Sequence, residues 1–226
     1  MEQIDVQKKM AGKKAVDYIK DGMTIGLGSG STVYWMMKRL GELVKEGLDI
    51  KGIPSSLRTE GWAKQFGVPL TDFSNTQQLD LAIDGADEVD PQFNLIKGGG
   101  GSLVREKIVN TASKKLIIII DESKLVDQLG AFSLPVEVVQ FGYEATALQI
   151  SKLGCEPVLR MNGKEPFVSN NGNFILDCPF RVINHPEQLN DDIKSVVGVV
   201  ETGLFLGMTD LVIVGKDACV EVLENS

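Results

Sequence analysis

Short apolar runs alternate with amphipathic segments along the first half of the chain. The runs have the length and composition of strands buried in a parallel sheet, and they lie at 23–27, 50–53, 79–83 and 116–120, with a shorter candidate at 68–70. Segments with apolar positions at helical spacing separate or precede them, at 3–20, 33–46, 58–66 and 102–112. Strands that alternate with helices predict an open, mostly parallel α/β sheet.

The pattern changes after about residue 131. Strand-like segments at 135–141, 157–160, 174–178 and 198–203 are interspersed with helical segments at 144–153 and 186–196. This β-α-β-β-α-β order is that of a ferredoxin-like unit. A last apolar strand at 211–214 is expected to rejoin the first sheet. We therefore predict a small ferredoxin-like α+β domain over 131–206, inserted into a larger domain formed by 1–130 and 207–226.

Composition narrows the classes of partner. The formal net charge of −8 makes nucleic acid and anionic membrane surfaces poor partners. No apolar run reaches the roughly 18 residues of a membrane-spanning helix. The three cysteines are far apart and show neither a zinc spacing nor a disulfide framework. We expect a cytoplasmic protein.

The turn at 28–32 has the composition of an anion site. Gly28 and Gly30 allow close approach of the backbone, and the helix that follows offers free amides and the positive end of its dipole. Ser31 replaces the last glycine of the dinucleotide fingerprint, and no Walker lysine follows. One interpretation is a cradle for a single phosphate, with hydroxyls from Ser29, Ser31 and Thr32. The other is a tight turn with a Ser or Thr helix cap.

A second stretch, from Asp84 to Lys107, combines carboxylates, a lysine and four successive glycines. Among Asp84, Asp87, Lys97 and Glu106, one carboxylate can take a proton from the carbon next to a carbonyl and return it to the neighbouring carbon, while an ammonium stabilises the enediolate. A second carboxyl group suits transfer of the hydroxyl proton between the two oxygens. The only histidine precedes a proline, so the base is expected to be a carboxylate. The turn at 28–32, Asp84–Asp87 and Asp121–Lys124 all follow predicted strands, where ligands of open α/β sheets bind.

Two other interpretations of this stretch remain open. The acidic residues from Asp84 to Asp90 can form a solvated turn, with Glu106 in a charged helix face. Asp84 and Asp87 can also hold one Mg²⁺ ion, although their spacing does not match an EF-hand loop.

Three motifs together resemble ribose-5-phosphate isomerases of the A type. They are GLGSGST at 26–32, DGADEVD at 84–90 and KGGGGSLVREK at 97–107. The similarity continues through DESK at 121–124, LPVEV at 134–138, NGNFILD at 171–177 and GLF at 203–205. Ser102 and Val104 stand where Ala and Thr are common in that family.

The resemblance implies a Rossmann-like domain with a small α+β domain, assembled as a homodimer or homotetramer. It implies interconversion of ribose 5-phosphate and ribulose 5-phosphate through an enediolate, without a metal or cofactor. Glu106 is then the catalytic base, and Asp84, Asp87 and Lys97 handle the sugar oxygens and the intermediate. The implied substrate-binding residues are Ser29, Gly30, Ser31, Thr32, Gly98, Gly99, Gly100, Lys124 and Lys8.

Two alternatives keep the fold but change the function. One is a sugar-phosphate sensor without catalysis, which would need an output module that the sequence does not display. The other is a different enzyme on a related fold, such as an amino-sugar phosphate deaminase or a CoA transferase.

Overall fold

The computed structural model describes residues 3–225, and the chain divides into two compact units. Within those residues, the first unit contains the chain up to Ala86, Arg105–Lys124, and the chain from Met208 onward. The second unit contains Asp87–Val104 and Leu125–Gly207. It therefore also takes in 87–104 and 125–130, which the hydrophobic pattern assigned to the larger domain.

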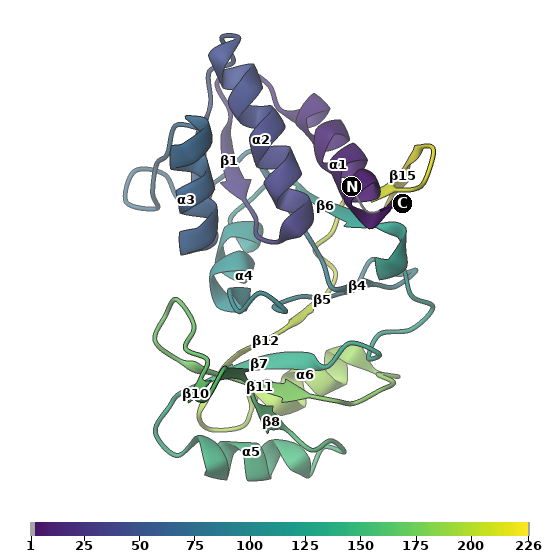
Figure 1. The fold of residues 1–226 in the computed structure, drawn as a ribbon. Helices are drawn as coiled ribbons and strands as arrows, with labels where there is room; N and C mark the ends of the chain where they lie inside the picture. The colour runs from purple at the N-terminus through teal and green to yellow at the C-terminus, as the bar shows by residue number, and fades with distance from the viewer. Residues whose placement is uncertain (1–2, 226) are drawn as a thin grey trace. The chain divides into compact units, whose positions relative to one another are not determined.

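The first unit is built on a mostly parallel sheet with the strand order β15-β14-β6-β3-β1-β2. Figure 1 labels β1, β6 and β15 of this sheet. From β14 to β2 in this order, neighbouring strands pair in parallel, and β15 pairs antiparallel with β14. The strands are β1 Thr24–Leu27, β2 Lys51–Pro54, β3 Leu81–Asp84, β6 Leu116–Asp121, β14 Leu211–Gly215 and β15 Val220–Glu224. This sheet confirms the predicted α/β class.

Two details of this sheet differ from the pattern-based prediction. Strand β15 was not predicted, because its apolar residues alternate with glutamates and it lies half-buried at the sheet edge. The candidate strand at 68–70 forms only an isolated bridge between Leu70 and Gly52. Pro69 has no N–H to donate to a ladder, which limits pairing there.

Helices cover both faces of the parallel sheet. They are α1 Gln3–Ala15, continued by a 3₁₀ turn at Val16–Tyr18, α2 Ser31–Lys45, α3 Leu57–Phe66 and α4 Leu103–Thr111. Side chains of α1, α2 and α3 share one core with alternate residues of the strands. On the opposite face, Val109 of α4 packs against Gly26, where an added Cβ would lie 2.5 Å from the valine Cγ1. Gly26 therefore permits the close contact of α4 with β1.

The second unit contains the predicted β-α-β-β-α-β unit. Its main sheet has the order β12-β7-β11-β8, and every pair is antiparallel. The elements are β7 Leu134–Val138, α5 Tyr143–Ser151, β8 Val158–Leu159, β11 Phe174–Cys178, α6 Pro186–Lys194 and β12 Val199–Thr202. Leu134, Val136 and Val138 alternate into a core that α5 and α6 complete. The ferredoxin-like prediction is confirmed.

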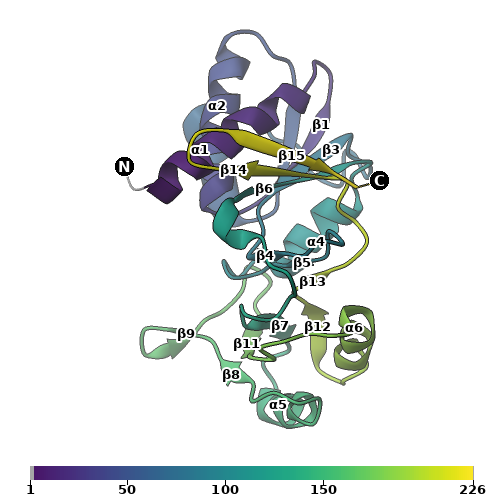
Figure 2. The ribbon, with the colours of Figure 1, turned by 90° about the vertical axis from the view of Figure 1, so that its right-hand side faces the viewer.

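Very short strands explain why residues 87–104 belong to the second unit. Strand β5 (Leu95–Ile96) pairs with β4 (Glu88–Val89) and with β13 (Leu204–Phe205), as Figure 2 shows. A separate hairpin joins β9 (Met161–Asn162) to β10 (Glu165–Pro166). Strands of two residues carry no periodicity, so the sequence pattern could not predict them. None of the helices described in residues 3–225 combines the length and the apolar character that crossing a bilayer requires.

Candidate active site

Three loops with polar side chains follow adjacent strands of the first unit. Strand β3 pairs in parallel with β1 on one side and with β6 on the other. Their carboxyl ends therefore share one edge, which places the turn at 28–32, Asp84 and the 3₁₀ turn Glu122–Lys124 along it. The chain leaves β1 toward β2 and returns to β3 on the other side, which makes this a topological switch point. Ligands of open α/β sheets bind at such points.

Asp84 lies at this edge and is fully buried. Its Oδ1 accepts hydrogen bonds from the amides of Ser29, at 2.9 Å, and Gly85, at 2.8 Å. Its Oδ2 accepts one from the side-chain amide of Asn110, at 3.0 Å. A Cβ on Gly28 would lie 2.5 Å from the Cα of Asp84, so only glycine fits there. Asp84 thus fixes the start of the 28–32 turn.

A cluster of hydroxyl groups supports the same turn from the α3 side. The Ser29 hydroxyl lies 2.9 Å from those of Ser55 and Ser56, and the Thr59 hydroxyl donates to the carbonyl of Gly28 at 2.7 Å. Ser56 also caps α3 by accepting from the amide of Thr59. The sequence pattern did not predict this cluster. The only available signal was Ser56 and Thr59 at helix-capping spacing after a strand.

The turn at 28–32 ends in an uncapped helix. The N-cap of α2 is Gly30, at a φ of 110°, and no side chain caps the helix. The amides of Gly28 and Ser29 bond to Ile83 and Asp84, so they are used within the fold. The amides of the first turn of α2, from Ser31 onward, are the ones directed at an incoming anion. The Ser or Thr cap of the alternative interpretation is therefore absent from the described start of α2, which favours the anion site.

The two candidate lysines lie on elements of the first unit that contact each other. Lys124 ends the 3₁₀ turn after β6, and Lys8 is in α1. The neighbouring Gln7 donates to Glu122 at 2.6 Å, which holds α1 against that turn. Lys8 lies one helical turn before Gly12, whose added Cβ would be 3.0 Å from the carbonyl of Thr32. Both lysines are half-buried.

Helix α4 carries Glu106 in its first turn, and Glu106 is only 3 % exposed. Asn110 follows four residues later, so both lie on one face of the helix. Because Asn110 bonds to Asp84, this face is directed at the carboxyl end of β3. Glu106 is therefore not part of a solvated charged surface.

The remaining candidates belong to the second unit. The Asp87 carboxylate accepts a hydrogen bond of 2.8 Å from the amide of Gly99. An added Cβ at Gly99 would lie 2.7 Å from Asp87 Oδ1, so a side chain there would displace the Asp87 carboxylate. Lys97 is buried, and its Nζ lies 5.3 Å from the centroid of the Phe205 ring. Asp87 and the glycine loop therefore form one hydrogen-bonded group.

Two other acidic side chains of the 84–90 stretch hold loops in place. Glu88 accepts hydrogen bonds from the amides of Gly130, at 2.7 Å, and Phe132, at 2.5 Å. Asp90 accepts from the amides of Gln92 and Asn94 within its own turn. Both are buried, so the interpretation of this stretch as a solvated acidic turn is wrong. Within residues 3–225, no group of three or more acidic, His or Cys side chains is arranged to hold a metal ion.

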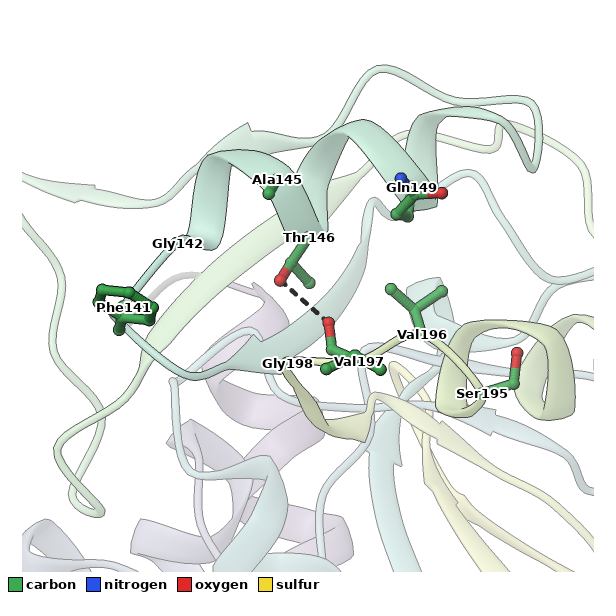
Figure 3. Close-up of a pocket in the computed structure, with 9 residues that line it drawn as sticks. All are labelled: Phe141, Gly142, Ala145, Thr146, Gln149, Ser195, Val196, Val197 and Gly198. Carbon is green, nitrogen blue, oxygen red and sulfur yellow. Dashed lines mark hydrogen bonds between the residues drawn. The ribbon is translucent and has the colours of Figure 1, made fainter.

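The second unit also contains a hollow of about 630 Å³, whose lining differs from the polar and charged residues of the candidate site (Figure 3). It lies between α5 and the turn after α6, where the Thr146 hydroxyl donates to the carbonyl of Val197 at 3.2 Å. Phe141 and Val197 line it and are almost fully exposed. None of the described residues that line this hollow is charged, so they lack the groups that proton transfer requires.

Comparisons with known proteins agree with one another. A family model described as ribose 5-phosphate isomerase A (phosphoriboisomerase A) matches residues 51–218. Ribose-5-phosphate isomerase A 1 of Oceanobacillus iheyensis is 58% identical over 217 residues, covering 96% of this chain and 97% of that protein. Ribose 5-phosphate isomerase from Plasmodium falciparum has a TM-score of 0.94 at 41% identity, covering 97% of this chain and 98% of the other. A D-ribose-5-phosphate isomerase in complex with phospho-erythronic acid has a TM-score of 0.95 at 38% identity, covering 99% and 100%.

Proposed function

This chain belongs to the ribose 5-phosphate isomerase A family, and from that premise we propose how its own residues carry out the reaction. The protein is an isomerase that interconverts ribose 5-phosphate and ribulose 5-phosphate. The observation that carries the proposal is the buried face of α4, where Glu106 precedes Asn110 by one turn and Asn110 bonds to Asp84.

The phosphate group is assigned to the start of α2. The amides of Ser31 and Thr32 and the positive end of the helix dipole favour an anion there. Lys8 and Lys124 add charge from α1 and the turn after β6, and Gly30 leaves the backbone uncovered. In this assignment Ser29 acts indirectly, because its amide and hydroxyl are used to shape the turn.

Glu106 is the proposed base. It takes the proton from the carbon beside the carbonyl and returns it to the neighbouring carbon, so the sugar passes through an enediolate. Such acid–base catalysis contributes about 10²–10⁴-fold in rate. Burial of Glu106 keeps bulk water from competing for the transferred proton.

We assign the handling of the sugar oxygens to Lys97, Asp87 and Asp84. The Lys97 ammonium stabilises the negative charge of the enediolate. Asp87 moves the hydroxyl proton between the two oxygens. Its side chain is only half-buried, so the carboxylate is open to the substrate. Asp84 contributes to substrate binding by holding the 28–32 turn in place. Gly98, Gly99 and Gly100 let their loop lie against the substrate.

The decisive variant is Glu106→Gln, which keeps the shape of the side chain but removes the base. We expect kcat to fall by about 10³-fold or more, while the Kd for phospho-erythronic acid changes by less than about threefold. Glu144→Gln, at an exposed position of α5, is the matched control and should behave as the unaltered enzyme. Turnover retained in Glu106→Gln would remove Glu106 from the role of base.

The proposed mechanism uses neither a metal nor another cofactor. Isomerase activity measured in excess EDTA should therefore equal the activity without it. A loss in EDTA that Mg²⁺ restores would instead support an ion held by Asp84 and Asp87.

The proposed function also includes an oligomeric state and a cellular compartment for the protein. We expect a homodimer or homotetramer that works in the cytoplasm, with a sugar phosphate as its only ligand and neither nucleic acid nor membrane as a partner. Sedimentation equilibrium tests the first point, since a species of one chain at micromolar concentration would contradict it.

A further inference from the structure

Arg160 directly follows β8 and reaches the glycine loop. Its Nη1 lies 2.9 Å from the carbonyl oxygen of Gly98 and 3.1 Å from that of Gly99, and donates to both. The same side chain pairs with Asp177 of β11, through Nε at 2.9 Å and through Nη2. The arginine side chain is 14 % exposed, so these bonds are shielded from water. One guanidinium thus joins the sheet of the second unit to the loop.

The peptide group between Gly98 and Gly99 is held at both ends. Its carbonyl accepts from Arg160, and its N–H donates to the Asp87 carboxylate at 2.8 Å. A trans peptide directs its carbonyl and its N–H in opposite directions, so the position of one determines the aim of the other. A charged donor on the carbonyl also polarises the peptide and strengthens the N–H as a donor.

A third contact restricts the far end of the loop. The ring of Phe167 lies against Gly101, where an added Cβ would be 2.5 Å from the ring Cε1. The guanidinium of Arg160 lies 5.9 Å from the centroid of the same ring. Arg160 therefore contacts the loop carbonyls directly and also packs on the side chain that covers Gly101.

We infer that Arg160 is a positioning residue for the isomerisation, acting through the Gly98–Gly99 peptide to hold Asp87 in its working orientation. This inference rests on the proposed function, because it depends on the role proposed for Asp87. It assigns Arg160 no contact with the sugar. Asp177 in turn holds the guanidinium in the plane that reaches both carbonyls. A pair needed only to join β8 to β11 would not require the two bonds to the loop.

The test compares Arg160→Met and Arg160→Lys with Arg39→Met, whose arginine makes only surface ion pairs with Glu42 and Glu46. We expect Arg160→Met to lower kcat by about 10²-fold, the scale of a small misplacement of a reacting group. KM for ribose 5-phosphate should change little. The thermal midpoint should fall, because Asp177 loses its partner, so kcat is measured well below it. Arg160→Lys keeps the charge but loses the planar fork, so its kcat should lie between that of Arg160→Met and that of the unaltered enzyme. Guanidinium ion added at millimolar concentration should restore part of the activity of Arg160→Met.

Double variants separate the inference from the proposed function. If Arg160 acts through Asp87, Arg160→Met combined with Asp87→Asn should lose little more activity than Asp87→Asn alone. Full multiplication of the two losses, a kcat of Arg160→Met within twofold of the unaltered enzyme, or a loss that tracks the thermal midpoint would each overturn the inference. If Asp87→Asn and Lys97→Met both kept full activity, the proposed roles themselves would fall.

Discussion

The side-chain amide of Asn110 donates a hydrogen bond of 3.0 Å to the carboxylate of Asp84. Both side chains are buried, and the bond joins α4 to the carboxyl end of β3. The helix that carries Glu106 is therefore tied directly to the strand that shapes the 28–32 turn. A single amide links the proposed base to the proposed phosphate site.

Asn110→Ala should therefore impair both stability and activity. It leaves one oxygen of a buried carboxylate without this donor, which costs about 1–3 kcal/mol of unfolding free energy. We expect kcat to fall more than KM rises, because α4 loses its tie to β3. Urea denaturation and steady-state kinetics measure the two effects. Thr111→Ala, at an exposed position of the same helix, is the control; equal effects of the two substitutions would contradict the prediction.

Gly28→Ala should be severely disruptive, whereas Gly61→Ala should not. The new methyl group at position 28 would lie 2.5 Å from the Cα of Asp84, so the turn or β3 has to move. Overpacking of this kind costs about 1–3 kcal/mol, and displacement of the turn should also weaken phosphate binding. Gly61 is exposed in α3 with nothing within 4 Å of an added Cβ, so alanine there should stabilise by about 0.5–1 kcal/mol. Thermal denaturation and the KM for ribose 5-phosphate test the pair.

Asp80 should contribute stability that disappears in acid. A hydrogen bond from Lys114 at 2.9 Å, and then one from the amide of Thr24, hold the pKa of Asp80 below its usual value. A lowered pKa in the folded state means that the contribution is complete above the unfolded pKa and is lost as the pH falls through the folded one. Because the pair is partly exposed, Asp80→Asn should cost at most about 1 kcal/mol at pH 7.

Urea titrations at pH 7 and near pH 2.5 measure this loss. The difference between Asp80→Asn and the unaltered protein should be largest at the first pH and should shrink toward the second. Asp127→Asn, at an exposed site, should show no such change between the two values. A difference of the same size at both would contradict the assignment.

The three cysteines should differ sharply in reactivity. Cys219 is exposed, whereas Cys155 and Cys178 lie in the core of the second unit. The hydrogen bond with the Cys155 thiol is the largest cause that raises the pKa of Cys178 well above its usual value, and burial is the second. Little thiolate is therefore present at Cys178. We expect one equivalent of fast reaction with a disulfide reagent, which Cys219→Ser removes. Fast labelling of Cys155 or Cys178, located by peptide mass spectrometry, would contradict this.

The sequence predicted what depends on local composition. The run at 116–120 is apolar at every position, so it could be assigned to a strand buried on both faces. The glycines at 28 and 30 indicated an anion site because their conformational freedom is a local property. The sequence could not separate Asp84 and Asp87 from Glu88 and Asp90, since all are acidic residues in one short stretch. Only their partners distinguish them.

The missed residues share a different cause. Arg160, Asn110 and Thr59 act through hydrogen bonds to groups 26 to 62 positions away in the chain. Such partners are brought together by the fold, and neither composition nor periodicity records them. The same holds for β4, β5 and β13, which are strands only because their partners lie beside them.

The turn at 28–32 has a consequence for the thermodynamics of binding. The amides of Gly28 and Ser29 already donate to Ile83 and Asp84, and the Ser29 hydroxyl is engaged by Ser55 and Ser56. The conformation of the turn is therefore set during folding. An arriving phosphate then has little ordering entropy to overcome at this position. Calorimetry with inorganic phosphate should accordingly report association with a small entropic penalty, as a rigid receptor gives.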